Sequence, residues 1–405
     1  MIYKLEVENF YSIRERQIID LTVGRRIPDE PGRLVPIYHG AKDRAPNVIA
    51  IYGANASGKS NVLRAIAFLT WFVEHSFGFP AGQQLPYQKF QTSEMISRES
   101  KFSLSFISSE DHDDPNRSRT CPYFYELTLS PRKLGTGEYV VSESLHYKPH
   151  ASIRPVRIFE RKGHKEIKAG QKLGVSSKEI SVLESIIRPD ASLISTLAQL
   201  NNSLAIALVA AARSVETNIL VTRIEHNEYN VLQGYANDQK LLSALNRDIK
   251  RIDLGVDQVQ ILARNGAPVA SFLHTGLDFP LEMWGESQGT QHFVKIYPVL
   301  HRILQTGGVA LVDELDSAIH PNVLPEIARW FSDPDRNPHG AQLWMSCHAV
   351  SLLDDLLKEE VLICEKSFDG ASQVYRLGDI SGIRRDENFS DKYLGGSYGG
   401  IPSIG

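Results

Sequence analysis

The stretch GANASGKS, residues 53–60, constrains the fold of this chain more than any other feature. Its two glycines, lysine and serine stand in the order G-x-x-x-x-G-K-S, which is the pattern of a loop that wraps around phosphate groups. The glycines let the backbone approach an anion closely, so that consecutive N–H groups and the N-terminus of a following helix point at it. A loop of this kind needs a buried strand before it and a helix after it.

The residues on either side of the loop meet that requirement. Residues 47–52, NVIAIY, are an apolar run rich in β-branched side chains, which predicts a buried strand. Residues 60–76 carry apolar side chains at helical spacing. In this arrangement Lys59 places its charge on the β- and γ-phosphates of a nucleotide, and Ser60 offers its hydroxyl to Mg²⁺. The expected ATP-binding residues are Gly53, Asn55, Ala56, Ser57, Gly58, Lys59, Ser60 and Asn61.

A second run, GVALVDE at 308–314, predicts the other half of a nucleotide site. Its apolar residues indicate a buried strand, and Asp313 and Glu314 follow at the carboxyl end, where open α/β sheets bind their ligands. Asp313 would hold Mg²⁺, and Glu314 would orient or deprotonate the attacking water. Paired acids at a strand end are also common on ordinary surfaces, so the complete phosphate loop is what favours the catalytic interpretation.

The rest of the pattern predicts an α/β fold with a mixed, largely parallel sheet and flanking helices. The two ends of the chain are expected to share that sheet, interrupted by a strand-rich and then helical insertion. We divide the chain into an N-terminal part of the head (1–107), the insertion (108–270) and a C-terminal part of the head (271–405). Outside the runs already described, strands are expected at 2–8, 16–23, 341–348, 360–366 and in several runs of 102–159, and helices at 324–332 and within 176–251.

Composition narrows the setting of the protein. A formal net charge of −4 argues against coating nucleic acid by bulk electrostatics, although a local basic face stays open. Cys121, Cys347 and Cys364 fit neither a disulfide framework nor a CxxC metal site, which favours a reducing, cytoplasmic location. The apolar run 204–212 has about half the length that spans a bilayer and predicts a buried helix, so no membrane contact is expected. The N-terminus lacks the form of a signal peptide.

The segment GESQGTQHF, residues 285–293, precedes the acidic pair at the place where ABC-type ATPases carry their signature. Ser287, Gly289 and Thr290 resemble the S-x-G-[TEQ] form of that signature. The resemblance implies that they contact, in trans, the γ-phosphate of ATP held by a second subunit. A serine that only caps the N-terminus of a helix would have the same local sequence.

Two further segments extend the resemblance to ABC-type ATPase heads. Asp316, in DELDSAIHP, resembles the D-loop that crosses to the second subunit. His348, in SCH, resembles the H-loop histidine that contacts the γ-phosphate. A glutamine usually completes the metal site in this class, and we assign it to Gln88 in LPYQKF. Gln83, Gln84 and Gln91 lie in the same interval.

Together with the opening LEVENFYSI and the ending DKYLGGSYGGIP, these motifs resemble the bacterial AAA15-type, or RloA/AbiL-like, ATPases, relatives of the OLD, SMC and RecF heads. The resemblance covers roughly the first 107 and the last 135 residues. It implies an ATPase with ATP and Mg²⁺ as cofactors, Glu314 and His348 as catalytic residues, and a homodimer or larger assembly formed around ATP. Like the PARIS and Septu ATPases, such a protein would act in anti-phage defence, with a phage-derived trigger and a separately encoded nuclease or toxin-like effector.

No nuclease activity is expected in this chain, because only about 55 residues follow His348 and leave no room for the Toprim domain of OLD-type proteins. The alternative is a RecF-like ATPase that binds DNA in repair or recombination. A nucleotide-binding subunit of a membrane transporter is a third interpretation, which the RecF-like N-terminus disfavours.

Overall fold

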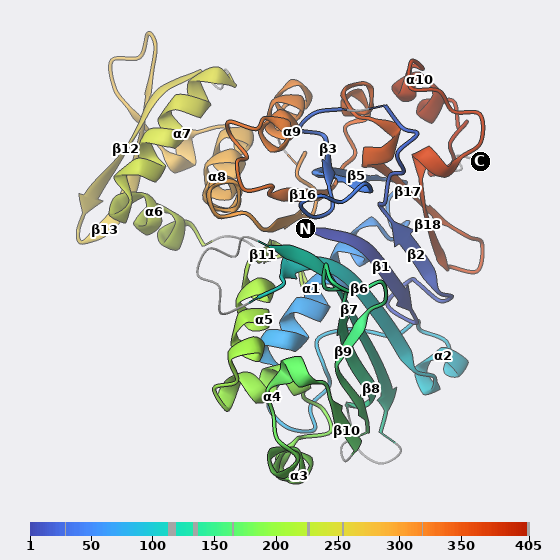
Figure 1. The fold of residues 1–405 in the computed structure, drawn as a ribbon. Helices are drawn as coiled ribbons and strands as arrows, with labels where there is room; N and C mark the ends of the chain where they lie inside the picture. The colour runs from blue at the N-terminus through green and yellow to red at the C-terminus, as the bar shows by residue number, and fades with distance from the viewer. Residues whose placement is uncertain are drawn as a thin grey trace.

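The computed structural model describes residues 1–28, 30–111, 119–132, 137–163, 166–224, 227–252, 255–317 and 319–402. Two large sheets organise these residues, with helices between and around them (Figure 1). The predicted α/β fold with a mixed, largely parallel sheet and flanking helices is confirmed.

The six-stranded sheet combines the two ends of the chain, as predicted. Its first five strands run parallel, and only the last pair is antiparallel. The edge strand β11 comes from the segment predicted as an insertion, so that segment contributes to the head sheet itself. In sheet order the strands are β11 (Val215–Thr217), β15 (Val309–Val312), β16 (Gln342–Ser346), β5 (Val48–Tyr52), β17 (Val361–Lys366) and β18 (Ser372–Arg376).

The second sheet has seven antiparallel strands, and its β1 and β2, which lie within the predicted strands 2–8 and 16–23, form a hairpin. Strand β6 pairs with β1 and leads on to β7–β10, so the strand-rich segment continues the N-terminal sheet. The predicted boundary after residue 107 falls inside β6, and the sheet has no break at that place. In sheet order the strands are β10 (Glu166–Ala169), β9 (Val156–Lys162), β8 (Glu138–Tyr147), β7 (Thr120–Pro131), β6 (Ser100–Ser109), β1 (Ile2–Glu8) and β2 (Gln17–Asp20).

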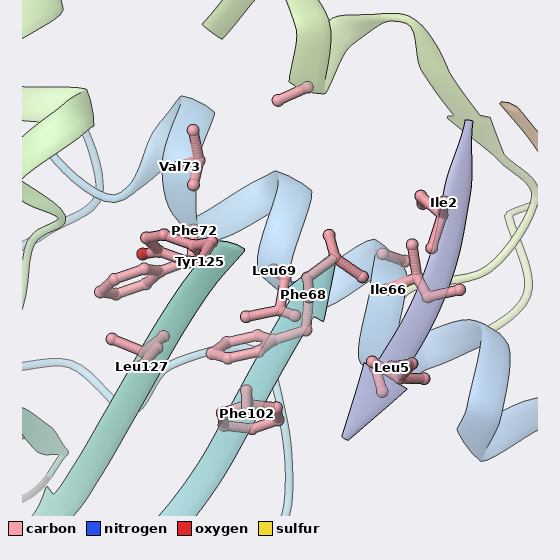
Figure 2. Packing of buried hydrophobic residues seen from close by; sticks show 14 of the residues in the cluster. Ile2, Leu5, Ile66, Phe68, Leu69, Phe72, Val73, Phe102, Tyr125 and Leu127 are labelled. Atoms are coloured by element: carbon pink, nitrogen blue, oxygen red, sulfur yellow. The ribbon is translucent and has the colours of Figure 1, made fainter. Parts of the chain in front are cut away.

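Helix α1 (Lys59–His75) lies between the two sheets and fills the first core with its apolar residues. Phe68 and Leu69 of α1 meet Phe102 of β6, and residues of β1 and β7 close the same core (Figure 2). Alternate side chains of β5 enter different cores, since Ile49 packs on the α1 side and Ala50 on the opposite side. A parallel strand buried on both faces explains the unbroken apolar run of residues 48–52.

The other face of the six-stranded sheet is covered by helices of the last third of the chain. Helix α8 (Gln288–Thr306) and helix α9 (Leu324–Ser332) contribute their buried faces to that second core. Beyond α8 lies a unit of two helices and the β12–β13 hairpin, whose buried residues share the second core with α8 (Figure 1, upper left). This unit contains α6 (Glu228–Asn237), α7 (Gln239–Arg251), β12 (Val256–Arg264), β13 (Ala267–His274) and β14 (Leu281–Glu282).

The remaining elements are short. Among the described residues no single helix is long and apolar enough to cross a membrane, whereas α4 and α5 reach that length only together, with a bend of 115° between them. The predicted buried helix at 204–212 lies within α5. These elements are α2 (Ser93–Ser97), α3 (Ser177–Ile186), α4 (Leu193–Gln199), α5 (Ser203–Arg213), α10 (Phe389–Leu394), β3 (Leu34–Pro36) and β4 (Arg44–Pro46).

Candidate functional site

The loop of residues 53–58 joins the end of β5 to the start of α1, as the phosphate-loop pattern predicts. Gly53 and Gly58 have φ angles of 152° and 110°. A Cβ on Gly53 would lie 2.3 Å from the carbonyl oxygen of Cys364, and one on Gly58 would lie 2.3 Å from the Ser372 hydroxyl. Both the backbone conformation and the available space therefore require glycine at these positions.

Two distant segments, those of Ser12 and Ser372, hold the loop in place. The Asn61 amide donates a hydrogen bond of 2.7 Å to the Ser12 hydroxyl, and the hydroxyls of Ser12 and Ser372 lie 2.6 Å apart. The Ser372 hydroxyl in turn donates to the carbonyl oxygen of Ser57 at 2.5 Å. Asn61, predicted to bind the nucleotide, thus uses its amide within this network and also accepts from Arg64 at 2.7 Å. The network stabilises the curved backbone that would receive phosphate.

Lys59 folds its side chain back over the loop. Its Nζ donates to the carbonyl oxygens of Gly53 and Ala54 at 2.8 and 3.1 Å. Burial lowers the pKa of Lys59, and the carboxylates of Asp313 and Glu314 act against that shift. The ammonium therefore lies in the loop itself, where a phosphate oxygen can replace a carbonyl as its acceptor.

Asp313 is the central acceptor of the site. One carboxylate oxygen, Oδ1, accepts hydrogen bonds from the hydroxyls of Ser60 at 2.9 Å and Ser346 at 2.7 Å. Asn218, just after β11, fixes the Asp313 backbone by accepting from its N–H at 2.7 Å and donating to its carbonyl at 3.1 Å. The structure thus brings together Ser60 and Asp313, which lie far apart in the sequence and were both predicted as Mg²⁺ ligands.

Glu314 follows in an unusual conformation. Its φ of 52° places a non-glycine residue in the left-handed region, which costs energy and is common at functional sites. Its N–H donates to the Ser346 hydroxyl at 2.7 Å, which holds the turn. Its Oε2 accepts a hydrogen bond of 2.8 Å from Nη1 of Arg223, and the side chain stays 46% exposed.

A cavity of about 720 Å³ lies beside these groups; Ser60 and Ser346 line it, and Asp313 is not among the described lining residues. Glu314 and His348 line it, and so do Gln88 and Gln91, whereas Gln83 and Gln84 do not. The structure therefore narrows the choice of glutamine to two of the four. All the predicted ATP-binding residues except Gly53 line the cavity: Asn55, Ala56, Ser57, Gly58, Lys59, Ser60 and Asn61.

Asp316 serves a local purpose in this chain. Its Oδ2 accepts hydrogen bonds from the backbone N–H groups of His348 and Ala349 at 2.6 and 2.7 Å. It thereby fixes the segment after β16 and directs His348 to the cavity. The predicted contact of Asp316 with a second subunit stays a prediction.

The predicted signature lies at the N-terminus of α8. Ser287 is the N-cap residue, and its hydroxyl accepts from the N–H of Thr290 at 3.1 Å. Ser287 is exposed, Gly289 is half-buried and Thr290 is buried. None of the three is among the described residues that line the cavity. The capping interpretation of Ser287 is therefore correct as local structure, and it leaves the in-trans role open.

Several residues of the site were missed from the sequence. Ser346 begins the SCH segment that contains His348. Its position at the end of a predicted buried strand could have indicated that it belongs to the site. Asn218 and Arg223 follow β11, which has only 3 residues and gives no periodic pattern. Ser12 and Ser372 reach the loop only through the tertiary fold.

The donor set around Asp313 suits Mg²⁺. Hydroxyl and carboxylate oxygens are hard ligands, and Mg²⁺ typically takes one or two of them from the protein and the rest from water and substrate phosphates. No group of three or more His, Cys, Asp or Glu side chains able to hold a metal occurs within the described parts of the chain. Ser60 and Asp313 would hold the ion.

The fold and the loop define a phosphate-loop ATPase domain, with β5 and α1 around the loop and β15 leading into the acidic pair. The chain belongs to the family described as "AAA domain, putative AbiEii toxin, Type IV TA system", whose model matches residues 48–354, more than half of the sequence. No curated protein sequence matches it.

Solved structures similar to this chain include three SMC heads. The SMC head domain from Thermotoga maritima is 14% identical, with 93% of this chain and 98% of that one covered and a TM-score of 0.41. An SmcHead bound to the C-winged helix domain of ScpA is 14% identical, with 92% and 97% covered and a TM-score of 0.46. An Smc head with an extended coiled coil, bound to the C-terminal domain of ScpA derived from Pyrococcus furiosus, is 12% identical, with 92% and 95% covered and a TM-score of 0.45.

Proposed function

We propose that this chain is an ABC-type ATPase that dimerises around ATP and acts as sensor or regulator in a bacterial anti-phage defence system. The observation that carries the hydrolytic part is the contact between Ser60 and Asp313 beside Glu314. These groups lie at the carboxyl end of parallel strands, next to a loop whose backbone suits phosphate.

In this proposal the loop N–H groups and Lys59 hold the phosphates. Lys59 exchanges the carbonyl oxygens of Gly53 and Ala54 for phosphate oxygens. Ser60 and Asp313 would hold Mg²⁺, which would supply positive charge against the negative charge of the phosphates. Glu314 accepts a proton from the attacking water, and His348 contacts the γ-phosphate.

The position of Ser287 supports the proposed dimer. The N-terminus of a helix carries free N–H groups and a partial positive charge, both suited to an anion. Ser287 is exposed and lies outside the chain's own nucleotide cavity. We therefore infer that Ser287 and Gly289 complete the site of a second copy, in agreement with the resemblance to ABC-type ATPases.

The defence role rests on the family. Its description names an AbiEii toxin and a Type IV TA system, which supports a role linked to toxin–antitoxin systems. The separate toxin-like or nuclease effector rests on the resemblance to the AAA15-type ATPases. In this proposal ATP-dependent dimerisation is the switch that a phage-derived trigger operates, and hydrolysis resets it.

The variant Glu314→Gln tests the proposal. It keeps the size of the side chain and removes the proton acceptor, so ATP should bind, hydrolysis should stop and an ATP-bound dimer should accumulate. Size-exclusion chromatography with light scattering, with and without ATP and Mg²⁺, measures the dimer, and phosphate release measures hydrolysis. A variant that stays monomeric with ATP, together with a wild type that hydrolyses none, would show the proposal to be wrong.

A DNA-binding measurement in the same experiment tests the alternative. A RecF-like repair ATPase should bind duplex DNA more tightly with ATP, and that binding should weaken steeply as salt rises. The defence proposal expects no such ATP-stimulated binding by the isolated protein.

A further inference from the structure

The Glu314 carboxylate is engaged by Arg223, a residue that no motif of the chain includes. Arg223 Nη1 lies 2.8 Å from Glu314 Oε2, and the two side chains are 34% and 46% exposed. A charge-assisted hydrogen bond from a guanidinium fixes a carboxylate more firmly than a neutral one does. The group proposed as proton acceptor is therefore held by a specific neighbour.

The segment that carries Arg223 is itself tied to the acidic pair. Asn218 makes two hydrogen bonds with the backbone of Asp313. Ile224 donates its N–H to the Asn218 carbonyl at 2.6 Å, and Ile219 forms a β-bridge with Arg223. Residues 218–224 thus form a closed turn, anchored at its base on Asp313, that presents Arg223 to Glu314.

Arg223 is not among the described residues that line the cavity of about 720 Å³, whereas Glu314 and Arg64 are. The guanidinium of Arg223 donates its hydrogen bond to Glu314 Oε2. The ion pair therefore joins a carboxylate that lines the cavity to a residue outside that lining.

We infer that Arg223 is a positioning residue that restrains hydrolysis by holding Glu314 Oε2 in an ion pair. The inference rests on the proposed function, because it concerns the general base of that reaction. A general base must reach the proton of its water. While Oε2 accepts from Arg223, that oxygen is directed to the guanidinium, and the pair has to open or turn before the carboxylate serves the water with this oxygen.

The variants Arg223→Ala and Arg223→Lys test the inference. Removal of the side chain should raise the kcat of ATP hydrolysis about two- to fivefold and leave the KM for ATP unchanged, because a half-exposed ion pair shifts an equilibrium by no more than that. Arg223→Lys keeps the charge and should return the rate toward wild type. The double variant Arg223→Ala with Glu314→Gln should be as inactive as Glu314→Gln alone, since the effect acts through Glu314.

Arg302→Ala is the matched control. Arg302 donates to Glu216 on β11 at 2.7 Å. The variant therefore removes an ion pair of the strand that precedes residues 218–224, and it leaves the Glu314 contact in place. Its rate should equal that of wild type, and thermal unfolding of all variants checks that they fold.

The outcomes separate the two proposals. A wild type that hydrolyses ATP and a folded Arg223→Ala variant that is equal or slower would overturn the restraint and leave the proposed function standing. An inactive wild type and an active Arg223→Ala would support both. If neither chain hydrolyses ATP, both are wrong.

Discussion

The cavity beside the phosphate loop and the N-terminus of α8 differ in how their polar groups find partners. At the cavity, side chains from distant segments bind one another, as Ser60, Asp313 and Ser346 do. At α8, Ser287 is satisfied by its own helix and faces solvent. The polar groups of the cavity are therefore held by contacts between distant segments of one chain. The cap of α8 is formed within the helix itself, and its serine is exposed. This difference favours a function for Ser287 that needs another molecule.

The largest expected effect comes from the first region. Lys59→Ala removes the only charge that lies inside the phosphate loop among the described residues, so ATP binding should be lost and hydrolysis should fall by more than about 100-fold. Fluorescent nucleotide titration and phosphate release measure the two. Lys295→Ala, which removes the 3.5 Å pair with Glu228 away from the cavity, is the control and should behave as wild type. Retained ATP binding in Lys59→Ala would break the assignment of the loop.

The second region should respond differently. Ser287→Arg should abolish hydrolysis and dimerisation and leave ATP binding by the monomer largely intact, because the serine would serve the neighbouring subunit. Ser176→Arg is a matched control: Ser176 caps α3 in the same way and lies in no nucleotide motif. Both variants lose a helix cap, at a cost of about 1 kcal/mol in stability. Equal rates of hydrolysis in Ser287→Arg and Ser176→Arg would show that Ser287 acts only as a helix cap.

The smallest effect concerns the glutamine. Gln88 and Gln91 both line the cavity, and Gln91 already donates its amide to the Lys89 carbonyl at 2.8 Å. Gln88→Ala should therefore raise the Mg²⁺ concentration needed for half-maximal hydrolysis by about tenfold, the lower end of what supporting residues of a metal site contribute. Gln91→Ala should leave it unchanged. The reverse result would move the metal-site assignment from Gln88 to Gln91.

The sequence predicted those features that depend on neighbouring residues, and it missed those that depend on contacts between distant segments. The phosphate loop and the strand before Asp313 are each one continuous stretch of sequence, so a few neighbouring residues were enough to predict them. A strand near residue 107 was predicted, but its place in the N-terminal sheet could not be seen, because antiparallel pairing with β1 joins residues about a hundred positions apart. Arg223 escaped notice for a similar reason. Its partner Glu314 is 91 residues away, and an isolated arginine after a three-residue strand has no pattern.

The ties of the phosphate loop to Ser12 and Ser372 have a consequence for how the protein is made. The loop is synthesised long before β18, yet one of its two clamping hydroxyls belongs to that strand, because Ser57 and Ser372 lie 315 residues apart. Contacts of such long sequence separation form late, because the ends of a long segment must first be brought together. A nascent chain on the ribosome therefore contains the complete loop sequence long before it has a finished nucleotide site. ATP binding should begin only after β18 has emerged.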